Sequence, residues 1–183
     1  FKMYASALIS GIALLLFTLC GTELISLYLS DSGSTGDIAL ALKYGKEYLA
    51  IMTLGLIPFA LGQAYISTIR ETGQTFVPML AGVAAVLINL VLDYLLIFGT
   101  SFTPAMGVRG AAIATVIARF VEFAIVVIWT HCHKSSNPYI VGAYTSPKIP
   151  SYILKGILVK GSPLMLNEML WASGMAVISQ CYA

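Results

Sequence analysis

The chain has 183 residues, of which 58% are hydrophobic and only 10% are charged, and its mean hydropathy is +0.89. A soluble domain carries about a quarter charged residues, so this composition excludes a soluble protein and predicts one that crosses a membrane several times. Ten basic and eight acidic residues give a net charge of only +2, and we expect no nucleic-acid partner. The cysteines Cys20, Cys132 and Cys181 lie far apart, which indicates neither a disulfide framework nor a zinc site.

Apolar runs predict five membrane-spanning helices, an all-α polytopic membrane protein. The predicted spans cover residues 3–29, 41–69, 77–98, 108–130 and 161–183. A polar linker at 134–160 separates the last span from the others, and its residues 151–160 alternate as in a short surface helix. The chain begins at Phe1 and ends at Ala183 within an apolar run, so we expect a fragment of a longer protein.

The basic residues are distributed unequally between the two sides that alternating spans define. One side carries Lys2, Arg70, Lys134, Lys148, Lys155 and Lys160. The other carries Lys43, Lys46 and Arg109, offset by Asp31, Asp37 and Glu47. Cytoplasmic loops of membrane proteins are enriched in lysine and arginine. We therefore place the 134–160 linker in the cytoplasm and expect a multi-pass protein of the plasma membrane.

The central span, 77–98, contains two polar residues, Asn89 and Asp93. They are four positions apart, so they lie on the same face of a helix. An ionised aspartate inside a membrane helix costs about 2.5–3.5 kcal/mol on insertion scales. Such a residue is retained where it faces protein, water or an ion, which makes this pair the first candidate for function.

Thr115 on the next span joins this pair at a similar depth. At about 1.5 Å per residue, Asp93, Thr115 and Asn89 lie about 8, 10 and 13 Å below the outer ends of their spans. The short connection between the two spans favours their being neighbours. Oxygen ligands of this kind suit a small hard cation, and the carboxylate alone suits a proton. A purely structural hydrogen-bond cluster is the alternative.

Further polar residues lie within the spans. Arg119 and Glu122 are three apart, and we interpret them as a structural ion pair. Gln63, Glu168 and Trp171 are candidates for lining a substrate cavity, the last two through charge and ring face toward an organic cation. Helix–helix contacts and interfacial anchoring are the alternatives for these three. The run His131 to His133 is interpreted as an interfacial polar cap.

The central motif resembles the multidrug and toxic compound extrusion (MATE) transporters. The matching residues are Pro78, Asn89, Asp93, Ile97 to Gly99, Pro104, Gly107 and the run Gly110 to Thr115, with Arg70 to Gly73 before them and Lys160 to Pro163 after them. The resemblance implies twelve helices in two lobes that alternate in access, with this chain covering about helices three to seven. Residues 1–133 would then belong to the amino-terminal lobe and 161–183 to the start of the second lobe.

The resemblance also implies roles. Asn89, Asp93 and Thr115 would form part of a cation site for Na⁺ or H⁺, with no other cofactor, and Glu168 is a second acidic candidate. The function implied is antiport that expels organic, often cationic, compounds. A flippase for a lipid-linked saccharide, which shares the fold, is the alternative. An enzyme would need a nucleophile, a base or a metal cluster inside the spans, and the sequence indicates none.

Overall fold

The computed structural model describes residues 2–29, 35–99, 104–134, 137–140 and 151–182. All regular structure in these ranges is helical. The helices are α1 (Lys2–Leu29), α2 (Thr35–Glu71), α3 (Phe76–Phe98), α4 (Val108–Cys132), the 3₁₀ turn η1 (Pro138–Ile140) and α5 (Ser151–Tyr182). This confirms the predicted all-α class.

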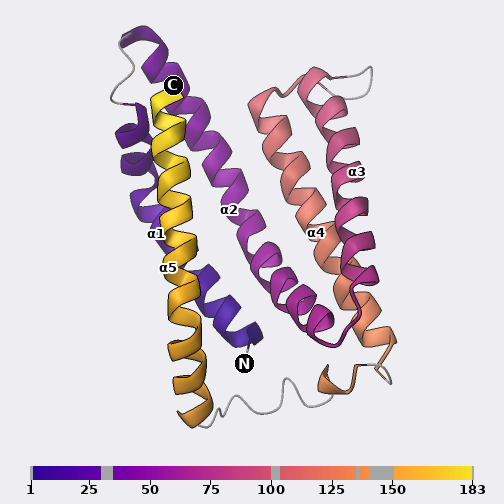
Figure 1. Ribbon diagram of the computed structural model, residues 1–183. Coiled ribbons are helices and arrows are strands. Elements are labelled where there is room, and N and C mark those ends of the chain that lie inside the picture. Colours follow the sequence, from indigo (N-terminus) through magenta and orange to yellow (C-terminus); the bar gives the residue numbers. More distant parts are fainter. Residues whose placement is uncertain (1, 30–34, 100–103, 135–136, 141–150, 183) are drawn as a thin grey trace.

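Helix α2 is the centre of the packing. It packs against α1 along one side and against α4 along the other, while α3 packs mainly against α4 (Figure 1). The short connection between α3 and α4 makes these two helices antiparallel neighbours, as the sequence predicted. The faces that carry Asn89 and Thr115 therefore belong to helices in direct contact.

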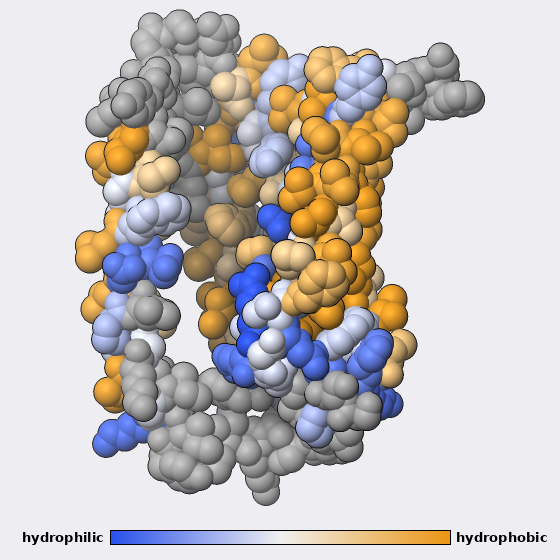
Figure 2. All heavy atoms as spheres, turned by 45° about the vertical axis from the view of Figure 1, so that its right-hand side comes forward, coloured by the Kyte–Doolittle hydropathy of each residue, from blue (hydrophilic) through white to orange (hydrophobic). Residues whose placement is uncertain are grey.

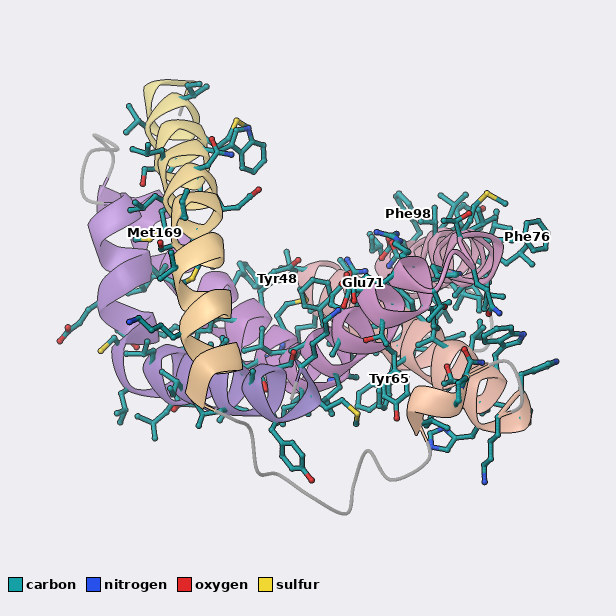
Figure 3. All side chains as sticks on the ribbon, turned by 60° about the horizontal axis from the view of Figure 1, so that its bottom comes forward. Tyr48, Tyr65, Glu71, Phe76, Phe98 and Met169 are labelled. Carbon is teal, nitrogen blue, oxygen red and sulfur yellow. The ribbon has the colours of Figure 1, made fainter. Side chains whose placement is uncertain are left out.

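Four of the helices are long and apolar enough to cross a membrane: Lys2–Glu23, Leu40–Glu71, Phe76–Phe98 and Val108–Cys132. Their outward-facing side chains are largely apolar, and Figure 2 shows hydrophobic residues covering much of the visible outer surface. Phe76 and Phe98, at the two ends of α3, point away from the neighbouring helices in Figure 3. Such a surface suits lipid and not water. Residues 161–182 of the fifth predicted span lie in α5, residue 183 lies outside the described residues, and the span itself stays a prediction.

Small residues allow the helices to approach closely, as expected in membranes. Ala81, Ala112 and Ala114 are fully buried. At Gly110 on α4, an added Cβ would lie 2.6 Å from the carbonyl oxygen of Leu96 on α3. Only glycine fits this position without moving the backbone of one helix.

A second set of contacts joins the opposite ends of the helices. Tyr65 on α2 is buried and lies edge-on to Phe123 of α4, with ring centroids 6.3 Å apart. Figure 3 shows Tyr65 pointing from α2 toward α4. Ile69 and Val126, both fully buried, complete this core. Tight packing here and at Gly110 fixes α4 relative to its neighbours at both ends.

Helix α2 begins at Thr35, and its part that is long and apolar enough to cross a membrane, Leu40–Glu71, agrees with the predicted span 41–69. One predicted boundary, within α5, was wrong. The predicted break between a surface helix and a fifth span is absent, because α5 continues through Pro163. A proline removes the hydrogen bond to the carbonyl four residues earlier, here that of Val159. The hydroxyl of Ser162 donates to this carbonyl at 3.2 Å, which satisfies the freed group. Parts of the 134–160 linker, including Lys148, lie outside the described residues.

Candidate functional site

Asn89 connects the two helices of the candidate site. With its amide nitrogen turned to Asp93, the orientation that satisfies both neighbours, Nδ2 donates to Asp93 Oδ2 at 3.3 Å. In the same orientation Oδ1 accepts from the backbone N–H of Thr115 at 3.3 Å. The structure therefore brings together all three residues that the sequence analysis selected.

The carboxylate of Asp93 is only half satisfied. Its Oδ1 is shielded from solvent and has no hydrogen-bond partner among the described residues. Buried polar atoms are nearly always paired, and an exception calls for an explanation such as a bound ion or a catalytic role. An unpartnered carboxylate oxygen is an acceptor for a proton or a ligand for a cation.

Thr115 contributes differently from what the sequence suggested. Its hydroxyl donates to the carbonyl of Ala111 at 2.9 Å, within its own helix. Its contact with Asn89 is made by the backbone N–H. The hydroxyl oxygen keeps lone pairs for a cation, but the link between the helices does not depend on the side chain.

The connection between α3 and α4 sets the register of the site. Gly99 and Gly107, at its two ends, have φ of 75° and 54°, a region that favours glycine. The N–H of Met106 donates to the carbonyl of Leu96 at 2.9 Å and ties the returning chain to the end of α3. Together with the close approach at Gly110, this fixes which residues of α4 face Asn89.

A pocket of about 260 Å³ lies next to this cluster, between α3 and α4. Small residues form part of its wall, and four of its lining residues are polar. Its lining includes Gly82, Ala85, Asn89, Thr115, Arg119 and Glu122. An ion or water in this pocket would reach Asn89 and Thr115 directly.

Arg119 and Glu122 are in contact, with Arg119 Nη1 donating to Glu122 Oε2 at 3.0 Å. The guanidinium carbon of Arg119 also lies 5.0 Å from the ring centroid of Phe59 on α2, a cation–π geometry. No sequence pattern indicates this second contact, because Phe59 is one of many aromatic residues in apolar runs. That the pair has a structural role stays a prediction.

The candidate cavity residues are not brought to this site. Gln63 is exposed on α2, and Glu168 and Trp171 are exposed on α5. Neither pocket lined by Thr115 includes any of them. The roles proposed for these three residues stay predictions.

The ion pair that joins α2 and α4 was missed. Arg109 at the start of α4 binds Glu47 of α2 through two hydrogen bonds, Nε to Oε2 at 2.7 Å and Nη2 to Oε1 at 2.5 Å. The sequence analysis had placed both residues on the same side of the membrane. That shared placement was the available signal, but it did not distinguish Arg109 from Lys43 and Lys46 as the partner of Glu47.

The histidines near the end of α4 bond their own helix. His131 Nδ1 lies 2.8 Å from the carbonyl of Val127, and His133 Nδ1 lies 3.0 Å from that of Trp129. Within the described ranges no group of three or more His, Cys, Asp or Glu side chains is placed to hold a metal ion. Asp93 is thus the candidate ligand of highest interest.

Comparison with known sequences decides the family. The sequence model of the MatE family matches residues 1–95, more than half of the chain. The chain belongs to the MATE family. The members of this family are transporters and not enzymes, and the MATE chain is accordingly a multi-pass membrane protein.

Individual relatives agree with this assignment. The chain is 29% identical over 173 residues to the probable multidrug resistance protein NorM of Thermotoga maritima, covering 94% of this chain and 35% of that protein. It is 30% identical over 171 residues to the multidrug export protein MepA of Staphylococcus saprophyticus, covering 93% and 35%. The MATE chain thus spans about a third of the length of these curated relatives. No solved structure matches it.

Proposed function

We propose that this MATE chain is part of a secondary antiporter that expels organic compounds in exchange for Na⁺ or H⁺. Asp93 binds the coupling ion, and Asn89 and Thr115 supply neutral oxygen atoms. The protein works in the plasma membrane, with the 134–160 linker on the cytoplasmic side. The names of the relatives, multidrug resistance and multidrug export proteins, support efflux as the direction of transport.

The observation that carries the proposal is the shielded, unpartnered Oδ1 of Asp93. An antiporter needs an ion whose binding favours one access state over the other; otherwise the gradient does no work. A carboxylate with one oxygen held by Asn89 and the other unpartnered is costly when bare. A proton or Na⁺ relieves that cost, so ion binding supplies the required difference in free energy.

A flippase for a lipid-linked saccharide is the alternative within the same superfamily. It would need several basic residues around its cavity to hold a pyrophosphate head. Among the described residues that line the two pockets beside Thr115, only Arg119 is basic. This supports the antiporter.

The test is transport by the full-length protein in reconstituted vesicles. Efflux of a fluorescent organic cation is driven by an imposed Na⁺ gradient or by a pH gradient, which identifies the coupling ion. Asp93→Asn keeps the shape of the side chain and removes its charge, so we expect insertion and folding but no gradient-driven efflux. Glu71→Gln is the matched control, because its partner Lys2 and its own exposed carboxylate lie on the surface. Full gradient-driven efflux by Asp93→Asn would sink the proposal.

A further inference from the structure

Arg119 lies on the boundary between two pockets. One is the pocket between α3 and α4, which also contains Asn89 and Glu122. The other, of about 240 Å³, lies between α2 and α4, the neighbouring helices seen in Figure 1. Thr115 and Arg119 line both, whereas Glu122 lines only the first. The α2–α4 pocket therefore contains a cationic group and no carboxylate among its described lining residues.

Most of the N–H groups of the Arg119 guanidinium make no hydrogen bond to the described residues. The guanidinium carries five N–H groups, and within the described residues only Nη1 donates, to Glu122. The arginine side chain is 42% exposed, while that of Glu122 is 12% exposed. The glutamate is thus largely covered, whereas part of the arginine side chain stays exposed beside the pocket.

The walls of the α2–α4 pocket are apolar. Met52, Leu56 and Phe59 come from α2 and Val116 from α4. Gly55 provides the close approach, because its Cβ position lies 3.1 Å from Val116 Cγ2. Sites for organic ligands have this composition, with mostly apolar walls and a few placed polar groups that set orientation.

We propose that the α2–α4 pocket binds an organic anion with an aromatic body, such as an aryl carboxylate or sulfonate. The acid group accepts hydrogen bonds from the unused N–H groups of Arg119, and the ring packs against Phe59, Leu56 and Met52. The cation–π contact with Phe59 holds the guanidinium, whose fork of N–H groups matches a planar carboxylate. The inference adds a substrate class to the proposed efflux function and rests on that function only for the direction of transport.

An organic cation fits this pocket poorly. Arg119 is the charged residue among its described lining residues, and like charges repel. Glu122 moderates the positive charge from the far side of the arginine but does not line the pocket. A neutral aromatic compound would gain the packing contacts and forgo the charge-assisted hydrogen bonds.

The experiment compares two probes with the same ring system, 2-naphthoate and the neutral 2-naphthamide. Binding to the full-length protein in lipid nanodiscs is measured by equilibrium dialysis. We expect the wild type to prefer naphthoate. The double variant Arg119→Gln with Glu122→Gln removes both charges and leaves neither partner unpaired. It should weaken naphthoate binding by about tenfold or more, the effect of charge-assisted hydrogen bonds, and leave naphthamide binding unchanged.

Two further variants separate charge from packing. Arg119→Lys keeps the charge and should retain part of the preference for naphthoate. Phe59→Leu should weaken both probes. Equal binding of the two probes by the wild type would overturn the proposal, as would an unchanged preference in the double variant. Absence of binding of either probe would also overturn it, since another part of the protein would then fill the pocket. Asp93→Asn should bind naphthoate normally, so loss of ion coupling and loss of this site are distinguishable.

Discussion

Asn89 and Thr115 are joined across the α3–α4 interface by a backbone contact: the amide oxygen of Asn89 lies 3.3 Å from the backbone nitrogen of Thr115. The same amide holds Asp93 Oδ2 at 3.3 Å. Asn89 thus both positions the carboxylate and connects the two helices. Thr115 takes part through its backbone N–H. Every substitution except one to proline keeps this group.

This relationship ranks the expected effects of substitutions at the two neutral candidate ligands, Asn89 and Thr115. Thr115→Val keeps the backbone N–H and removes only the hydroxyl, so we expect a moderate loss of ion affinity. Asn89→Ala removes the bridge to α4 and the donor to Asp93, and it should weaken ion affinity more. The apparent ion affinity of gradient-driven efflux measures both. A larger loss in Thr115→Val than in Asn89→Ala would show that the hydroxyl is the stronger ligand.

The close approach at Gly110 predicts that a larger residue there lowers the stability of the protein. Gly110→Ala places a Cβ 2.6 Å from the Leu96 carbonyl oxygen, so α3 and α4 must separate. Overpacking of this kind costs about 1–3 kcal/mol, and it also moves Thr115 away from Asn89. We expect a lower melting temperature and weaker ion binding in the purified full-length protein.

Gly82→Ala is the matched control for Gly110→Ala. Gly82 is also a helical glycine at the α3–α4 pocket, but its Cβ position has nothing within 4 Å. Its melting temperature should equal that of the wild type or exceed it, because alanine favours helix more than glycine. Equal melting temperatures for both variants would contradict the close approach at Gly110.

The Arg119–Glu122 contact predicts coupled stability effects. Removing one partner of a buried ion pair costs about 3–5 kcal/mol, and because Arg119 is partly exposed, leaving it unpaired in Glu122→Gln should cost less than that. Arg119→Gln leaves Glu122, the more buried group, without its partner, so it should destabilise more than Glu122→Gln. The double variant should recover most of the loss. The melting temperatures of the two single variants and the double variant are compared in detergent. If the decrease in the double variant equals the sum of the two single decreases, the residues do not act as a coupled pair.

The charge asymmetry predicts the orientation of the chain. Single cysteines at Ser34 and Ser146, both outside the described residues, are placed in a full-length protein without native cysteines. Position 34 should react with an impermeant reagent on intact cells, and position 146 only after lysis. Labelling of both positions on intact cells would contradict the assigned topology.

The sequence by itself determined the membrane class, the helical class and the shared face of Asn89 and Asp93. These follow from composition, from apolar length and from the helical period, which are properties of one segment at a time. The neighbouring positions of α3 and α4 followed from their short connection. From the residues themselves, Thr115 was selected by its depth on a neighbouring span, and depth places a residue only along the membrane normal.

The tertiary structure decided how each helix is rotated toward the next. That rotation depends on where small residues allow two helices to approach, as Gly110 does beside the Leu96 carbonyl. No single segment encodes it. It left Asp93 Oδ1 without a partner among the described residues, gave Thr115 a backbone role, and set Arg119 over Phe59. It also selected Arg109 as the partner of Glu47. In α5, which continues past Pro163, the carbonyl of Val159 that the proline frees accepts a hydrogen bond from the Ser162 hydroxyl.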